Sequence, residues 1–278
     1  MQKHTILWST LLLCTLSSAS NTILQLSYEN LTFDNSRKKD KGVREGVDVA
    51  FQSQQNHYQL HYEQTHTQTF QPPLSKDLKV KKYYAKYSRD LAGNQALFLS
   101  YTTIDDNLMK ETDGGKIYGF GYRYNTLKLS QYLSDYPHFN VYQSEAAYTF
   151  KRDYPSLNTS LTLVQKYIHL QNKESNNFSK NAKTNYFTTG IKLHTHYQSY
   201  HFGAGAFFGK RIFAVMNNGF KVQHHAMEFN KTYMCGIGKH FKWGGVHLKY
   251  VHQEATEVPI NNKGVTVDNL IVQVGYTF

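Results

Sequence analysis

The chain has 278 residues, a formal net charge of +11 and 40% hydrophobic residues, among them 22 Tyr and 17 Phe. So aromatic a composition, with only 5 Pro, excludes an intrinsically disordered protein. No run of about 18 apolar residues occurs after residue 20, which excludes transmembrane helices.

The N-terminal segment predicts export. It contains Lys3, an apolar run over 6–16, and small residues at Ser17 and Ala19 with the spacing of a cleavage site. A membrane anchor or a buried strand is the alternative, but the run is too short to span a bilayer as a helix. We therefore predict a signal peptide over 1–19 and one domain over 20–278.

Cleavage of this signal peptide would leave a single thiol. It would remove Cys14 and retain Cys235, so no intrachain disulfide could form in the mature chain. Acylation of Cys14 is a second interpretation, which we disfavour because "LLL" before it offers no small residue. An exported chain of this size without disulfides needs a large core or a membrane to stabilise it.

Segments that alternate between apolar and polar residues recur along the whole chain. In the third of them, Tyr58, Leu60 and Tyr62 alternate with polar residues, which is the period of a strand with unlike faces. No convincing helix lies between these segments. The predicted strands are 22–33, 44–53, 57–64, 79–88, 95–104, 116–125, 126–133, 139–150, 156–170, 184–196, 199–210, 226–238, 243–252 and 267–278.

Short and long connections alternate between the predicted strands. The long ones cover 34–44, 65–78, 105–115, 171–183, 213–223 and 253–264, with 134–139 as a brief member of the same set. A soluble sandwich has no reason to place its long loops at one end, whereas outer-membrane barrels have short periplasmic turns and long external loops. We predict an all-β fold, a transmembrane antiparallel up-and-down barrel of about 14 strands, with 12 to 16 as the range.

The faces of these strands also suit a bilayer. Their apolar residues would face lipid, and the outward candidates are Leu97, Leu99, Tyr118, Phe120, Tyr122, Leu127, Leu129, Tyr148, Phe150, Leu161, Leu163, Ile191, Leu193, Phe202, Phe208, Phe229, Ile237, Leu248 and Tyr250. Their polar residues would face the lumen, and the predicted pore-lining residues are Lys82, Lys86, Arg123, Lys128, Glu145, Lys166, Lys192, His194, Arg211, Glu228 and Lys249. The excess of cations predicts a preference for anions.

The last strand ends in "VGYTF" and so on the aromatic residue Phe278. It resembles the terminal strand of Gram-negative outer-membrane β-barrel proteins, the porin-like superfamily. The resemblance implies a location in the cell outer membrane, contact with its lipids and lipopolysaccharide, and Tyr276 and Phe278 as an assembly signal read by the barrel-assembly machinery. The basic stretches 36–45 and 75–82 would bridge lipopolysaccharide phosphates or form an electropositive mouth.

Histidines are the candidate metal ligands. His194 and His196 share one face of a strand, and a tight turn at "YQ" would set His201 across from His194, so that three imidazoles could bind zinc or copper. No carboxylate or Cys shares that face, so we favour polar lining of the lumen and predict neither metal nor cofactor.

No catalytic constellation is recognisable, because Ser, His and acidic residues are scattered without a positioned nucleophile and base. We expect a monomeric passive diffusion channel, a porin, for small polar or anionic solutes, with no nucleic-acid partner and no enzymatic activity. Two alternatives remain: a lipid-modifying outer-membrane enzyme, with a Ser–His or His–carboxylate pair at the outer lipid boundary, and a barrel for transport or surface assembly of proteins or polymers, with a lumen plugged by loops.

Overall fold

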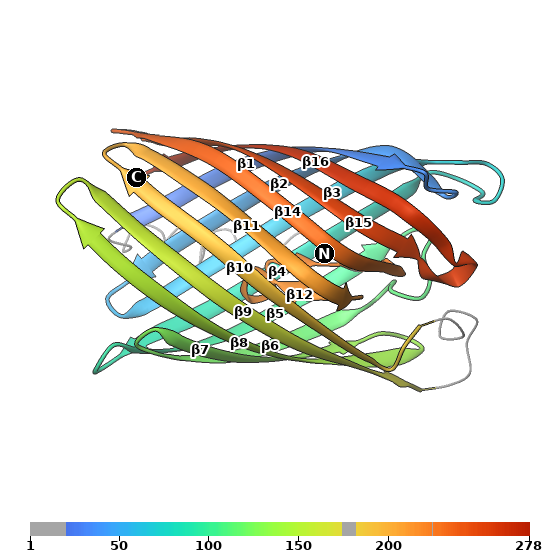
Figure 1. The fold of residues 1–278 in the computed structure, drawn as a ribbon, viewed down its shortest axis with the longest axis horizontal. Helices are drawn as coiled ribbons and strands as arrows, with labels where there is room; N and C mark the ends of the chain where they lie inside the picture. The colour runs from blue at the N-terminus through green and yellow to red at the C-terminus, as the bar shows by residue number, and fades with distance from the viewer. Residues whose placement is uncertain (1–20, 174–181, 224) are drawn as a thin grey trace, which may run out of the picture.

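The computed structural model describes residues 21–173, 182–223 and 225–278, so the predicted signal peptide lies outside the described residues. These residues form a closed antiparallel barrel of 14 strands, which confirms the predicted fold class (Figure 1). No helix of the described residues has the length and apolar character to cross a membrane.

Each strand of the barrel pairs with its neighbour in the chain, and β1 closes the barrel against β16. The barrel strands are β1 (Asn21–Asp34), β2 (Lys39–Ser53), β3 (Asn56–Thr69), β4 (Leu78–Leu91), β5 (Gln95–Asp106), β6 (Lys116–Tyr124), β7 (Leu127–Asp135), β8 (Phe139–Tyr154), β9 (Leu157–Asn172), β10 (Asn185–Tyr197), β11 (Tyr200–Arg211), β14 (Met227–Phe241), β15 (Gly244–Glu257) and β16 (Asn262–Thr277). Closure satisfies the backbone groups that an open edge would leave unpaired in lipid.

The two ends of the barrel differ in their connections. At one end, which we name the turn end, connections are short: Asn125 and Gln198 adopt φ of 51° and 53° there, the left-handed conformation that tight hairpins require. Phe278 also lies at this end, and its N–H donates to the carbonyl oxygen of Thr22 (2.9 Å). The opposite end, the loop end, carries the longer connections. Long and short connections therefore alternate as predicted.

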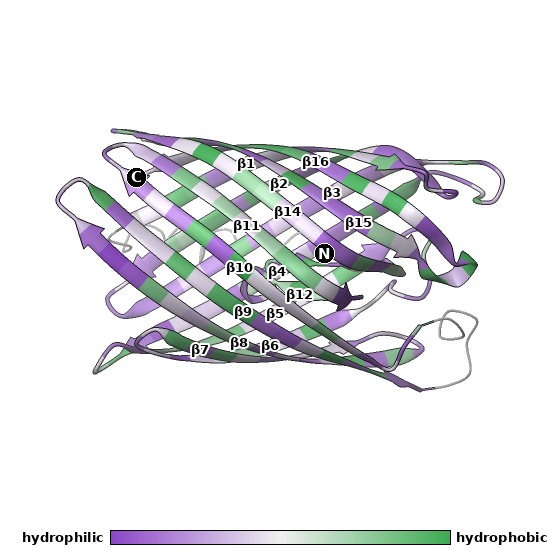
Figure 2. Ribbon diagram, viewed as in Figure 1, coloured by the Kyte–Doolittle hydropathy of each residue, from purple (hydrophilic) through white to green (hydrophobic). Residues whose placement is uncertain are grey.

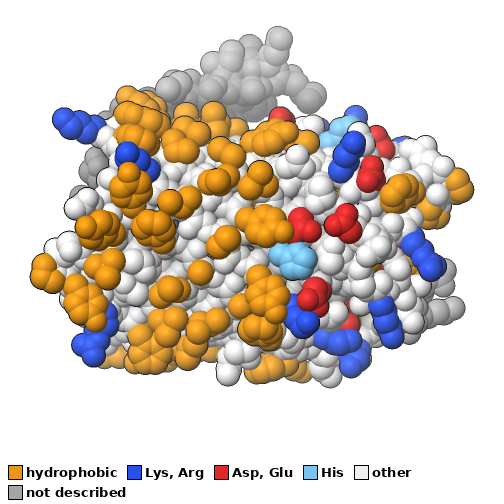
Figure 3. All heavy atoms as spheres, turned by 45° about the horizontal axis from the view of Figure 1, so that its top comes forward, with side chains coloured by type: hydrophobic (Ala, Val, Ile, Leu, Met, Phe, Trp, Pro, Cys, Tyr) orange, Lys and Arg blue, Asp and Glu red, His pale blue; other side chains and the backbone are white. Residues whose placement is uncertain are grey.

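Alternate residues of the strands face outward and form an apolar belt (Figure 2). Leu99, for example, is 55% exposed, while the next residue, Ser100, is buried. Over the face drawn in Figure 3, hydrophobic side chains gather toward the turn end and charged ones toward the loop end. The predicted outward residues that are exposed are Leu97, Leu99, Tyr118, Phe120, Leu127, Leu129, Tyr148, Phe150, Leu163, Ile191, Leu193, Phe202, Phe208, Ile237, Leu248 and Tyr250.

Phe229 was predicted to face outward, and this is wrong. Its side chain is buried inside the barrel with Met227 and Val267. The cause is a bulge in β14 between Phe229 and Lys231, where the pairing with both neighbouring strands shifts and the alternation changes phase.

Two predicted long loops are mostly strand. β2 begins at Lys39, so the connection after β1 is only 35–38, and most of the basic stretch 36–45 is strand. The predicted loop 253–264 likewise shrinks to 258–261. Past the apolar belt the outer face of a strand contacts water, so polar residues are favourable there and the strand can continue without apolar alternation. The loss of that alternation therefore does not mark the end of the strand.

The connection between β11 and β14 folds into the barrel, although the sequence predicted an external loop. We name residues 212–223 with 225 and 226 the inner loop; it holds β12 (Val215–Met216), the 3₁₀ turn η1 (Asn217–Gly219) and β13 (Lys221–Val222). Ile212 and Phe213 are fully buried. They join one hydrophobic cluster with inward residues of β4 to β10, so the inner loop fills that side of the lumen.

Candidate functional site

The backbone of the inner loop is fixed to the barrel wall at Val215. Gln143 on β8 donates from Nε2 to the Val215 carbonyl (2.7 Å) and accepts from its N–H at Oε1 (2.9 Å). Lys166 on β9 donates to the same carbonyl (3.1 Å). Because Gln143 and Lys166 are both buried, these bonds form away from bulk water and hold β12 in one place.

The tip of the inner loop is fixed on the opposite side. Tyr84 on β4 donates to the carbonyl of Asn218 (3.1 Å), and Lys82 on the same strand donates to that of Val222 (3.3 Å). Thr102 on β5 donates to the carbonyl of Gly219 (3.3 Å). The inner loop is thus a fixed part of the lumen rather than a loop over its mouth.

A buried ionic cluster supports β13. Arg44 bridges Glu29 (2.9 Å) and Glu63 (3.4 Å), Lys82 pairs with Glu63 (2.7 Å), and Lys221 of the inner loop pairs with Glu29 (3.3 Å). Three cations and two carboxylates are therefore interlocked between β1, β2, β3, β4 and the inner loop.

Glu63 is the carboxylate whose loss should destabilise the barrel most. We expect Glu63→Gln to lower the free energy of unfolding by about 3–5 kcal/mol, because it leaves Arg44 and Lys82 as buried cations with one carboxylate between them. Denaturant unfolding in lipid vesicles measures this. The control is Glu254→Gln, which breaks the exposed pair with Lys231 (2.9 Å) and should cost under about 1 kcal/mol. Equal losses in the two variants would contradict this account.

A second buried cluster lies on the other side of the inner loop. Glu145 on β8 pairs with Lys166 and with Lys128 (3.3 Å), and Lys128 also donates to the side chain of Asn218. Lys82, Lys128, Glu145 and Lys166 were all predicted to line a pore. The structure places them inside the barrel, where they hold the inner loop.

Four predicted lumen cations have no carboxylate within ion-pair distance among the described residues: Lys86, Lys192, Arg211 and Lys249. Lys192 donates to the side chain of Asn217 in the inner loop (3.4 Å). Arg211 donates only to Thr232. Of these four, Lys192, Arg211 and Lys249 line the chambers beside the inner loop, where they contribute uncompensated positive charge.

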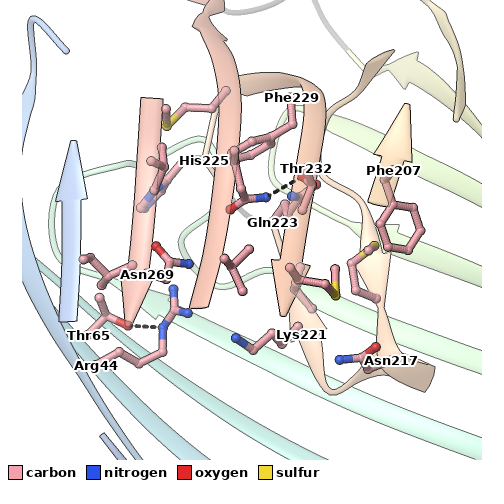
Figure 4. Close-up of a pocket in the computed structure, with 18 of the residues that line it drawn as sticks. Arg44, Thr65, Phe207, Asn217, Lys221, Gln223, His225, Phe229, Thr232 and Asn269 are labelled. Atoms are coloured by element: carbon pink, nitrogen blue, oxygen red, sulfur yellow. Dashed lines mark hydrogen bonds between the residues drawn. The ribbon is translucent and has the colours of Figure 1, made fainter. Parts of the chain in front are cut away.

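Three chambers of the lumen are bordered by residues of the inner loop. The loop-end chamber has a volume of about 150 Å³ and is shown in Figure 4, where Arg44, Phe207 and Phe229 enter it from the wall. The second chamber, about 260 Å³, reaches His201 and His247, and the third, about 380 Å³, reaches Arg123 and Asn125; both lie toward the turn end.

All three chambers share two residues, Lys192 of β10 and Asn217 of the inner loop. Lys249 lines the loop-end chamber and the second chamber. Lys192 and Asn217, whose side chains are hydrogen-bonded to each other (3.4 Å), therefore form part of the wall of all three chambers, and we name this contact the narrow point.

The remaining predicted lumen residues lie away from this point. Lys86 lies over the ring of Phe98 (5.8 Å), and Arg123 pairs with Asp90 (3.4 Å). Glu228 pairs with Lys210 (2.6 Å) and lines none of the three chambers, because the bulge in β14 turns its neighbours into the lumen instead.

The candidate histidines come together, although not in the predicted register. His201 lies opposite His196, not His194, because the turn is at 198–199 rather than one residue earlier. The pairing slips by two residues, so the side chains stay on one face, and His194 Nδ1 lies 3.3 Å from His201 Nε2. His247 adds a ring 5.7 Å from that of His201. Within the described ranges, no group of three or more His, Cys, Asp or Glu residues could hold a metal ion.

Solved structures of similar fold are outer-membrane proteins. Omp33 of Acinetobacter baumannii matches with a TM-score of 0.51 at 8% identity, over 93% of this chain and 99% of that one. CymD, a monoaromatic hydrocarbon channel, matches with a TM-score of 0.54 at 8% identity, over 94% and 89%. A FadL homologue of Pseudomonas aeruginosa matches with a TM-score of 0.50 at 9% identity, over 93% and 90%. No protein-family model and no curated protein matches the sequence. The chain has the fold of Gram-negative outer-membrane β-barrel proteins.

Proposed function

We propose that the protein is a monomeric passive diffusion channel of the outer membrane, with the turn end in the periplasm and the loop end outside. The observation that carries the proposal is the sharing of Lys192 and Asn217 by all three chambers. A solute that passes between these two side chains crosses the level of the inner loop. The apolar belt supports the location in a membrane, and a channel neighbour such as CymD is consistent with it.

The charge on this route favours small anionic solutes. Lys192, Arg211 and Lys249 carry positive charge without carboxylate partners, whereas the acids of the lumen, such as Glu63 and Glu145, are engaged in ion pairs. A cation in a narrow lumen of low dielectric attracts an anion more strongly than it would in water. Selectivity would thus come from three side chains on one side of the lumen.

The inner loop is the feature closest to the alternative of a plugged transport barrel. It packs against inward residues of β4 to β10, while the third chamber stays along β6 to β10 toward the turn end and the second chamber lies along β10, β11, β14 and β15. Because chambers adjoin the Lys192–Asn217 contact from both the loop end and the turn end, we favour a narrowed channel over a closed plug.

An enzyme acting on lipids finds one supporting feature, a His–carboxylate pair on the outer wall. His252 Nδ1 lies 2.8 Å from Asp268 Oδ1. The neighbouring strands place Tyr233 and Asp268 opposite His252, so no serine nucleophile faces this pair across either neighbouring strand. The pair therefore supports catalysis less well than the chambers support permeation.

The aromatic residues of the proposed assembly signal lie at the turn end. Tyr276 and Phe278 are exposed with ring centroids 4.8 Å apart, and Trp243 lies 6.5 Å from Tyr276. This exposure at the proposed periplasmic rim suits recognition by the barrel-assembly machinery, which stays a prediction.

Single-channel recording in a planar bilayer tests the proposed function. We expect the refolded protein to give stable ohmic steps, with a reversal potential under a salt gradient that indicates a modest preference for anions. The folded state is verified by heat-modifiable migration in gels. The absence of conductance from a folded barrel would overturn the proposed channel. A cation preference would overturn the proposed role of Lys192, Arg211 and Lys249.

A further inference from the structure

Arg211 occupies an unusual position in the loop-end chamber. Its side chain is fully buried, yet Nη2 donates to Thr232 Oγ1 while Nε and Nη1 have no hydrogen-bond partner in the described structure. The guanidinium lies between two rings, 5.7 Å from the centroid of Phe207 and 5.5 Å from that of Phe229. It is therefore a rigidly held cation with donors left over.

A buried guanidinium with unpaired donors would be stabilised by an anion that accepts hydrogen bonds from it. Unpaired buried charges and donors are costly, and proteins normally satisfy them. The only carboxylate that lines the same chamber is Glu63, which is already engaged by Arg44 and Lys82. No acidic group of the described chain is thus available to Arg211, which is among the residues that line the chamber.

The chamber is apolar along one part of its wall, although Lys192, Lys221 and Lys249 also line it. Its wall includes Phe207, Met227, Phe229 and Val267, and its volume of about 150 Å³ is of the size that accommodates one six-membered ring. A fully hydrated ion such as phosphate gains nothing from these side chains, whereas a hydrocarbon group is stabilised by them.

We propose that the loop-end chamber is a binding site for a small apolar monocarboxylate, whose carboxylate accepts hydrogen bonds from Arg211 and whose hydrocarbon body, no larger than one ring, packs against Phe207, Met227 and Phe229. The proposal rests on the proposed function in one respect: the solute would reach the chamber along the channel. Charge-assisted hydrogen bonds from a fixed guanidinium provide the specificity for a carboxylate.

Equilibrium binding tests this site without reference to conductance. Calorimetric titration of the refolded protein in detergent would use cyclohexanecarboxylate as the probe, with cyclohexylmethanol, acetate and phosphate as comparisons. We expect cyclohexanecarboxylate to bind at least about tenfold more tightly than each of the others, since only it offers both the charge and the ring.

Arg211→Met is the decisive variant. It should weaken binding of cyclohexanecarboxylate at least about tenfold and still fold, because an apolar side chain of similar length in place of an unpaired buried charge is tolerated. Lys231→Met, on the outer wall, serves as the matched control and should bind like the unaltered protein.

The outcomes separate the two proposals. Equal binding by the Arg211→Met variant and the unaltered protein would overturn the site, even if the protein conducts. If acetate and phosphate bound as tightly as cyclohexanecarboxylate, the chamber would be an unselective anion site. This result would overturn the proposal of an apolar monocarboxylate. Selective binding by a folded protein that does not conduct would support the site and overturn only the channel.

Discussion

Removal of the hairpin of the inner loop is expected to raise single-channel conductance several-fold. The variant lacks 215–222, with Ala214 joined to Gln223 through two glycines. This junction is short enough because the N–H of Gln223 already donates to the carbonyl of Ala214 (2.9 Å). The deletion removes Asn217 and so opens the narrow point at Lys192, where the cross-section limits the current.

The deletion also removes partners of Gln143, Lys82 and Lys166, but water enters the widened lumen and replaces them. Heat-modifiable migration verifies that the variant folds. The control shortens the connection 70–77 between β3 and β4, where residues 71–73 are exposed, and should leave the conductance unchanged. An unchanged conductance in the folded deletion variant would mean that current does not pass the inner loop.

The barrel itself could be predicted because a bilayer imposes strict rules on a sequence. Lipid on one face and water on the other force a period of two, and Leu97 and Leu99 show this as plainly in the sequence as in the structure. The rules apply only at the depth of the lipid. Past the belt they no longer act, so the start of β2 at Lys39 and the end of β15 at Glu257 could not be read from the pattern.

The inner loop was missed although the sequence contains a signal for it. Phe213, Val215, Phe220 and Val222 give the connection more apolar residues than an external loop in water needs, and they are the residues that face the wall cluster or the wall itself. No local sequence pattern shows where the inner loop packs, because its hydrogen-bond partners Gln143 and Tyr84 lie far away in the chain.

Two errors of register show the same limit. The bulge at Phe229 changes the phase of one strand without a glycine or proline to mark it. The turn after β10 is displaced by one residue, yet the candidate histidines still meet, since a slip of two in the pairing keeps every side chain on its face. The face of the sheet on which a side chain lies is therefore more predictable from the sequence than the residue that lies opposite it on the next strand.

Reversal of two lumen charges is expected to change the sign of the selectivity. The double variant Lys192→Glu, Lys249→Glu places two carboxylates where the chambers meet, and no described carboxylate pairs with either lysine in the unaltered protein. Anions would then be repelled at the narrow point, and the reversal potential under a salt gradient should move from the anion side to the cation side.

The matched control is Lys79→Glu, Lys81→Glu, which changes the net charge by the same amount on exposed outer positions of β4. At about 0.1 M salt, charges more than about 10 Å from the route are screened, so this variant should keep the anion preference. If both variants shifted the reversal potential equally, selectivity would arise from the overall charge of the molecule. If only the lumen variant shifts it, the selectivity lies at Lys192 and Lys249, beside the narrow point that the inner loop creates.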